Sequence, residues 1–183
     1  MQTTSNREIP KATRDPRPAL NGRWSVDPRD SYVRFVAATL VGLVTVPGRF
    51  RSMSGSLVVD DARAAGALLI ECASIDTGNR LRDRHLRSRD FFDAERHPHL
   101  HYEAHSISGR GLGKQHVDGE LIVAETRVPM PLEVTFHAPS EGVLALVCHT
   151  DVDRIALGIR GARLMVPRSV EIDVAITLRR QIA

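Results

Sequence analysis

The chain has 183 residues, of which 42% are hydrophobic and 26% charged, and this is the balance of one globular domain. No apolar run approaches the ~18 residues that a membrane-spanning helix needs, so a spanning protein is excluded. The formal net charge is +3, and much of the excess lies in residues 1–22. The remainder is too evenly balanced for a nucleic-acid-binding surface.

Residues 1–22 are polar, contain Pro10, Pro16 and Pro18, and show no periodicity. This composition predicts a flexible N-terminal arm in front of one domain at residues 23–183. The same segment lacks the apolar core of a secretion signal, which favours a cytoplasmic location.

The two cysteines, Cys72 and Cys148, each lie inside an apolar run typical of a strand. A disulfide framework would need more cysteines in a short secreted chain. We therefore expect two buried thiols that act as small apolar side chains.

Alternation of apolar and polar residues recurs from Trp24 onward, and a period of two is typical of a half-buried strand. It is clearest at residues 170–178, where apolar side chains occupy every second position. Two runs, 66–75 and 142–152, are apolar at both parities, which predicts strands with both faces covered.

Residues 79–92 interrupt the alternation. Leu81, Leu86 and Phe92 lie at helix-like spacings among charged residues, so we expect a short helix, capped by Asp76 or Asn79.

The fold class predicted from these elements is mainly all-β. About eight sequential antiparallel strands, each with one apolar face, must close or stack to bury that face. We therefore expect an eight-stranded antiparallel β-barrel with one helical insertion. Such a barrel can be filled by its own side chains or hold a small ligand. The alternation of apolar and polar residues is the same in both cases, so it does not distinguish them.

The densest charged cluster lies at residues 80–96, where arginines alternate with acidic residues. One interpretation is a solvated surface whose ion pairs contribute little. Another is an arginine-rich rim for an anionic head group, because guanidinium groups suit phosphate and carboxylate. The interleaved acids and the lack of stacking aromatic residues argue against duplex nucleic acid as a partner.

Histidines and one glutamate share a face of the strand near residue 100, since residues two apart in a strand point the same way. These are His99, His101, Glu103 and His105. The residues between them are apolar, so this polar face is expected to meet water. It could alternatively bind a metal through His99 and His101, but a further ligand would have to converge from elsewhere.

The sequence contains no phosphate-binding loop, dinucleotide-binding glycine motif, serine-nucleophile elbow or HExxH motif. His85 and Asp83 are two residues apart on the expected helix and do not face each other. The chain is therefore predicted not to be an enzyme.

Residues 74–98, with the text SIDTGNRLRDRHLRSRDFFDAERHP, strongly resemble the signature of the YceI-like family. Other pieces agree in order, among them Gly48-Arg49-Phe50 before Gly55 and the segment from Val117 to Leu121. The resemblance extends over about residues 23–180.

This resemblance implies a lipocalin-like barrel that binds a polyisoprenoid, a fatty-acid-like lipid or another long-chain amphiphile, in many members as a homodimer. It implies no cofactor and no catalytic residues. The alternatives left open are a metal-binding or enzymatic barrel that uses the surface histidines, and a structural or stress-associated barrel with a filled interior.

Placed on this chain, the resemblance makes the inward-facing residues candidates for ligand binding, although each can equally serve as core packing. The candidates on strands are Val33, Phe35, Leu57, Leu100, Tyr102, Leu121, Leu132, Val134, Phe136, Val170, Ile172 and Val174. Those of the helical insertion are Leu86, Phe91 and Phe92, and those of the rim are Arg82, Arg84 and Arg87.

Overall fold

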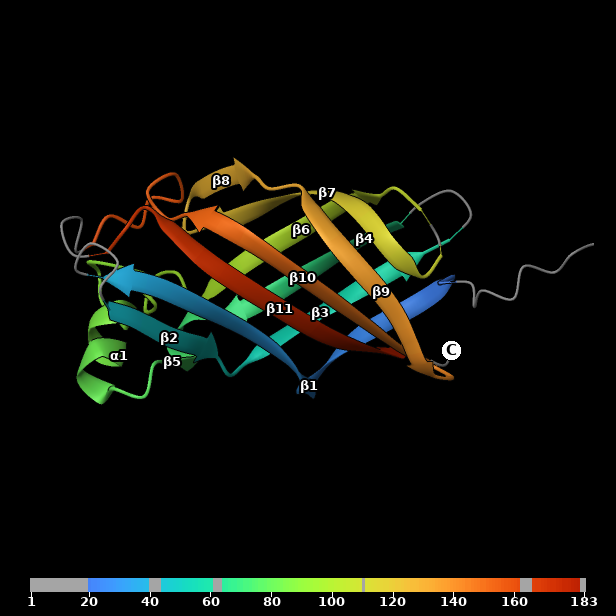
Figure 1. The fold of residues 1–183 in the computed structure, drawn as a ribbon, viewed down its shortest axis with the longest axis horizontal. Coiled ribbons are helices and arrows are strands. Elements are labelled where there is room, and N and C mark those ends of the chain that lie inside the picture. The colour runs from blue at the N-terminus through green and yellow to red at the C-terminus, as the bar shows by residue number, and fades with distance from the viewer. Residues whose placement is uncertain (1–19, 40–43, 61–63, 110, 162–165, 182–183) are drawn as a thin grey trace, which may run out of the picture.

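The computed structural model describes residues 20–39, 44–60, 64–109, 111–161 and 166–181. Within these residues, eight antiparallel strands close into a barrel (Figure 1), which confirms the predicted fold class. The ring runs β1 (Gly22–Thr39), β3 (Met53–Val59), β4 (Ala64–Glu71), β6 (His99–Ile107), β7 (Gly113–Val123), β9 (Leu132–Ser140), β10 (Val143–Asp153) and β11 (Ser169–Arg180), and β11 pairs with β1.

Three short strands lie outside the ring. β2 (Val44–Phe50) pairs with the second half of β1, β5 (Ile75–Asp76) pairs with β2, and β8 (Thr126–Pro129) pairs with β7. A 3-10 turn at Cys72–Ser74 and helix α1 (Arg80–Arg87) complete the elements of the described residues. The helix lies at one end of the barrel, beside β2 and β5 (Figure 1).

Strand β1 closes the barrel because it pairs with β3 and also with β11, and along its length it has a further partner in β2. Its first residues, from Gly22 to Ser25, pair with β3, and its last seven pair with β2. The register with β11 shifts between Asp27 and Tyr32, and such a bulge increases the bend of a strand. The barrel therefore continues past its ring of eight strands at the end that carries α1.

The barrel core consists of the alternating apolar residues. Phe136, Leu144 and Leu178 are among the largest side chains that are fully buried, and they come from neighbouring strands of the sheet. Strand β1 begins at the end of the barrel remote from α1 (Figure 1), and its third residue, Trp24, is buried, with its indole Nε1 donating to the Leu20 carbonyl at 2.8 Å.

The predicted arm at residues 1–22 lies mostly outside the described residues. Its last part belongs to the barrel, because Leu20 is buried and Gly22 already pairs with Val59.

The predicted helix is shorter than residues 79–92. Asn79 is its N-cap, and its side-chain oxygen accepts from the amides of Leu81 and Arg82 at 3.0 and 3.1 Å. The helix ends at Arg87, and Phe91 and Phe92 lie in the following turn. The Phe92 amide donates to the Leu86 carbonyl, so the aromatic residues are positioned by a turn and not by helical periodicity.

Cys72 and Cys148 are buried free thiols, as predicted. Burial raises the pKa of Cys72 to about 11 and also raises the pKa of Cys148. No helix within the described residues is long and apolar enough to cross a membrane.

Candidate functional site

Two apolar cavities lie inside the barrel. The larger, of about 190 Å³, is here named the cap cavity; it lies under α1 and the turn that follows, and its walls include Phe35, Phe50 and Phe92. The smaller, of about 130 Å³, is named the distal cavity, and its walls include Leu57 and Phe136.

The two cavities adjoin, because Leu68, Tyr102, Leu132 and Val174 line both. We call these four residues the waist. The Tyr102 hydroxyl donates to the Met130 carbonyl at 3.0 Å, and its pKa is raised by burial. A chain that occupied both cavities would therefore pass beside a tyrosine whose hydroxyl already has a hydrogen-bond partner.

Gly119 makes room for the tyrosine of the waist. A Cβ atom at this position would lie 2.5 Å from the Tyr102 hydroxyl oxygen, which is closer than real Cβ contacts. Gly48 has the same relation to Phe35, whose ring atom Cζ would lie 2.1 Å from a Cβ. Both glycines fall in segments that carry the family resemblance, so part of that signature reflects space for aromatic side chains of the cavity walls.

All the apolar candidates from the sequence lie in the walls of these cavities. Those of the cap cavity are Val33, Phe35, Leu86, Phe91, Phe92, Leu100, Leu121, Val170 and Ile172. Those of the distal cavity are Leu57, Val134 and Phe136, and those shared by both are Tyr102, Leu132 and Val174.

The cap cavity is covered by segments that are far apart in the sequence. Phe92 packs edge-on to Phe50, and Phe50 packs against Phe35, each pair with ring centroids 5.9 Å apart. From the loop after β10, Leu157 and Ile159 are buried and line the same cavity. We name α1, the turn at residues 88–98 and the described part of the loop at residues 154–168 the cap.

Arg154 organises the loop part of the cap. It is 5% exposed, and its guanidinium donates to the carbonyls of Ile159, Gly161, Val166 and Pro167 at 2.6 to 2.9 Å. A buried charge is retained only where its donors have partners. The loop therefore wraps around one side chain and turns Leu157 and Ile159 towards the cavity.

The predicted rim arginines lie in the cap but outside both cavity walls. Arg82 donates to the hydroxyl and carbonyl of Thr77 at 2.7 and 2.9 Å, and Arg87 donates to the Ile75 carbonyl at 2.7 Å. Arg84 is exposed in a surface cleft that also contains acidic residues. Two of the three therefore stabilise the backbone around α1, and the head-group role of the three stays a prediction.

Much of the YceI-like signature builds the cap. Asp83 is buried and accepts from the amide and hydroxyl of Thr77 at 2.9 and 2.6 Å. Asp76 forms ion pairs with Arg49 and Arg51, and the amide of Gly78 together with Arg51 lowers the pKa of Asp76. These contacts connect α1 to β2 and β5.

The sequence did not predict several residues of the cavity walls. Leu68, Leu146 and Val152 lie in the runs that are apolar at both parities, so period two did not distinguish their inward face. The expectation that both faces of residues 142–152 are covered is wrong for Val147, which is 41% exposed in the single chain. Leu157 and Ile159 lie in a loop, and a loop has no periodicity from which an inward face could be predicted.

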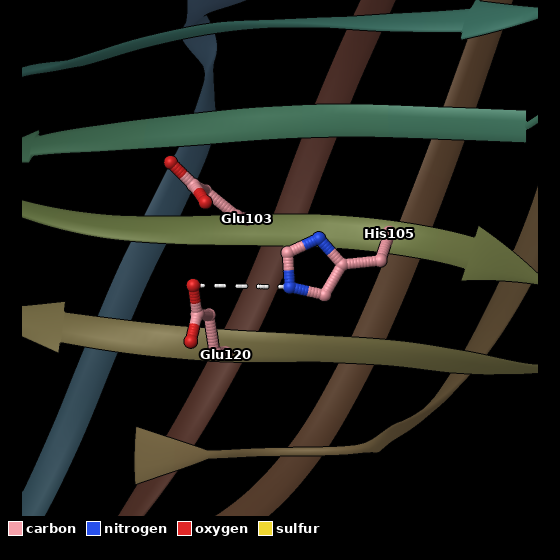
Figure 2. A group of neighbouring side chains, drawn as sticks. All are labelled: Glu103, His105 and Glu120. Atoms are coloured by element: carbon pink, nitrogen blue, oxygen red, sulfur yellow. Dashed lines mark ion pairs between the residues drawn. The ribbon is translucent and has the colours of Figure 1, made fainter. Parts of the chain in front are cut away.

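The polar face of β6 lies on the outside of the barrel, as predicted. His99 is exposed, and His101 Nδ1 lies 3.5 Å from Glu103 Oε1. The structure adds Glu120 of β7, which approaches Glu103 and His105 (Figure 2).

Other outward histidines pair with carboxylates. His116 lies between Glu133 and Asp118, and His149 pairs with Asp173 at 2.7 Å. The hydrogen bonds to Glu133 and Asp173 raise the pKa of His116 and His149 respectively.

A closed antiparallel barrel with an apolar interior and a helical cap defines the class of small β-barrels that can enclose a ligand. A model of the YceI-like domain matches residues 24–178, and the chain belongs to this family.

Solved structures share the fold. A polyisoprenoid binding domain from Saccharophagus degradans, implicated in plant cell wall breakdown, superposes with a TM-score of 0.74 at 14% identity, covering 86% of this chain and 98% of that one. BcnA of Burkholderia cenocepacia superposes with a TM-score of 0.73 at 23% identity, covering 83% of this chain and 98% of that one.

Curated relatives match over a shorter region. A UPF0312 protein of Vibrio parahaemolyticus is 28% identical over 99 residues, which is 52% of each chain. Another, of Shewanella baltica, is 29% identical over 105 residues, which is 56% of this chain and 54% of that one. The chain thus spans about half the length of the curated relatives it matches.

Proposed function

We propose that the barrel binds and carries one long-chain amphiphile, a polyisoprenoid or fatty-acid-like lipid, with its tail in the cap cavity and the distal cavity. The observation that carries this proposal is the pair of adjoining cavities with apolar walls. Each methylene group transferred from water to such walls contributes roughly 0.8 kcal/mol. A flexible tail therefore needs no elaborate polar chemistry for affinity.

The waist determines whether a long tail can occupy both cavities. Such a tail must pass Leu68, Tyr102, Leu132 and Val174 to reach both cavities. A short tail can remain in the cap cavity alone. We therefore expect chain length to be selected at the waist.

We propose further that the barrel is not a catalyst. The groups in the walls that could act as nucleophiles include the Cys148 thiol and the Tyr102 hydroxyl. Burial raises the pKa of both, so both remain protonated at neutral pH, and a protonated thiol is a poor nucleophile. The fold neighbour described as a polyisoprenoid binding domain supports a binding role.

The test is native mass spectrometry of the purified protein, followed by organic extraction of any bound compound. We expect a discrete added mass that is lost on denaturation and is identified as a long-chain amphiphile. A clean unliganded mass, with no uptake of added isoprenoid alcohol or fatty acid, would contradict the proposal and favour a barrel with a filled interior.

A matched pair of variants tests whether the ligand binds inside the barrel. Val174 faces the waist, whereas Val147 is exposed on the outside of the neighbouring strand. We expect Val174→Phe to reduce retention of long tails more than short ones, and Val147→Phe to bind as the parent protein does. Equal behaviour of the two variants would place the ligand outside the barrel.

The homodimer implied by the family resemblance stays a prediction. Light scattering coupled to size-exclusion chromatography measures the mass in solution directly.

A further inference from the structure

Three metal-ligating side chains converge on the outer wall of the barrel, away from both cavities. Glu103 and His105 come from β6, and Glu120 comes from β7, where it is the direct cross-strand partner of Glu103. One ligand atom from each lies within 4.8 Å of those of the other two, and His105 Nε2 is 3.8 Å from Glu120 Oε1. Figure 2 shows the imidazole directed towards the carboxylates.

A break in strand pairing lies at His105. Ala104 pairs with Gly119 and Ser106 pairs with Asp118, so the register between β6 and β7 shifts at the residue between them. A β-bulge leaves one residue unpaired and re-aims its side chain. The bulge explains why the imidazole approaches Glu120, the residue opposite Glu103.

The two glutamates already share a cation. Arg127 of β8 forms an ion pair with Glu120, and its Nη1 lies 3.7 Å from Glu103 Oε2. Its side chain is 59% exposed, and ion pairs of exposed side chains contribute little stability. The guanidinium can therefore move into solvent at low cost when another cation takes its place.

We propose that Glu103, His105 and Glu120 form a binding site for a divalent transition-metal ion, for which Zn²⁺ is the best-suited probe. One imidazole nitrogen with two carboxylate oxygens suits zinc, whereas magnesium and calcium prefer oxygen donors alone. Ligand atoms of tetrahedral zinc lie roughly 3.3 Å apart for bonds of about 2.0–2.1 Å. Side-chain rotation closes the remaining separation, and water fills the open coordination positions.

This site is independent of the proposed lipid function. Tyr102 and Ala104 of the same strand line the cavities, whereas Glu103 and His105 lie on the other face. A failure of lipid binding therefore leaves the metal site untouched, and the reverse also holds.

The structure also revises the metal-binding alternative left open from the sequence, which would have used His99 and His101. His101 contacts Glu103 from two residues earlier on the same strand, and His99 is the cross-strand partner of Glu71. The convergent third ligand is Glu120, and the histidine that reaches it is His105.

The test is isothermal titration of the untagged full-length protein with Zn²⁺ near neutral pH. We expect one zinc ion per chain, and at least tenfold weaker binding in both His105→Ala and Glu120→Gln. Arg127→Gln should bind zinc severalfold more tightly, because it removes the competing cation. Side-chain NMR of the histidines provides a second measurement, in which zinc should shift His105 first.

His116→Ala is the matched control. His116 is also exposed and lies near two carboxylates, but these contact opposite nitrogens of its ring, at 2.8 and 3.2 Å. One ion cannot join all three groups, so His116→Ala should bind zinc as the parent protein does. The proposal is overturned if the parent protein binds no zinc, if His105→Ala binds it unchanged, or if loss follows His116 or His99.

Discussion

At the end of the barrel that carries α1, side chains donate to backbone carbonyls: Arg154 in the loop after β10, and Arg82 and Arg87 around the helix. At the remote end, Phe136 and Leu178 are buried among apolar residues of the strands, and the Trp24 indole adds one hydrogen bond to the Leu20 carbonyl. Both ends adjoin a cavity, but the cap is closed by several directional hydrogen bonds and the far end mainly by packing.

This difference predicts different responses to mutation. Packing in a closed sheet is shared by many neighbours, so its loss lowers the stability of the whole barrel. Hydrogen bonds that hold one loop can be lost locally, while the strands remain paired. The cap is therefore expected to open without unfolding of the barrel, which provides a route for a ligand.

The largest effect is expected for Phe136→Ala at the far end. Phe136 is 2% exposed, and removing a buried phenylalanine costs about 3–5 kcal/mol of unfolding free energy. Because the distal cavity already adjoins this ring, we expect a value near the lower end of that range. Urea denaturation measures it, and Phe136→Leu should lose less than half as much.

A somewhat smaller effect, confined to the cap, is expected for Arg154→Met. The substitution leaves four carbonyl groups without their guanidinium partner, and we expect a loss of about 3 kcal/mol in the stability of the cap. Hydrogen exchange should show faster exchange of the Leu157 and Ile159 amides.

The control for this variant is Arg168→Ala, since Arg168 is exposed and pairs with Asp153. It should leave the stability of the cap close to that of the parent protein, because exposed ion pairs contribute little. If Arg154→Met unfolds the barrel as a whole, the cap is not a separately opening region.

A further change in the cap is Asn79→Ala. Asn79 is the N-cap of α1 and accepts from two amides, so its removal should cost about 1 kcal/mol. Thermal unfolding provides the measurement. Asn79→Asp keeps an acceptor and should remain near the parent value, whereas equal losses in both variants would mean that the capping interaction is not responsible.

The smallest effect is a response of the cap to acid. The Arg168 hydrogen bond, with the amides of Ala156 and Ile155, lowers the pKa of Asp153 from its ordinary value of 3.8. A lowered pKa in the folded state gives stabilisation that is complete above the ordinary value and is lost as pH falls through the lowered one.

We therefore expect severalfold faster opening of the loop at residues 154–161 as pH falls from roughly 5 to 2, measured by hydrogen exchange corrected for its intrinsic pH dependence. The Asp153→Asn variant should show a weaker dependence on pH. An unchanged dependence would assign the effect to other carboxyl groups.

Local patterns predicted much of the barrel. Alternation identified the inward residues of β9 and β11, such as Phe136 and Ile172, because residues two apart in a strand share a face in any sheet. Asn79 was identified as a possible cap because its amide group suits the first turn of a helix. The predicted length of α1 was wrong, because the turn after the helix places the Phe92 side chain where one more turn of helix would also have placed it.

The sequence by itself determined most of the strands, the inward faces of those that alternate and, through the signature around α1, the family. Only the tertiary structure decided which distant residues meet: Arg154 with the carbonyls of its loop, and Glu120 with Glu103 and His105. The reason is physical, because periodicity reports the orientation of a side chain relative to its own strand. Contact between strands depends on their order and register, including the bulge at His105.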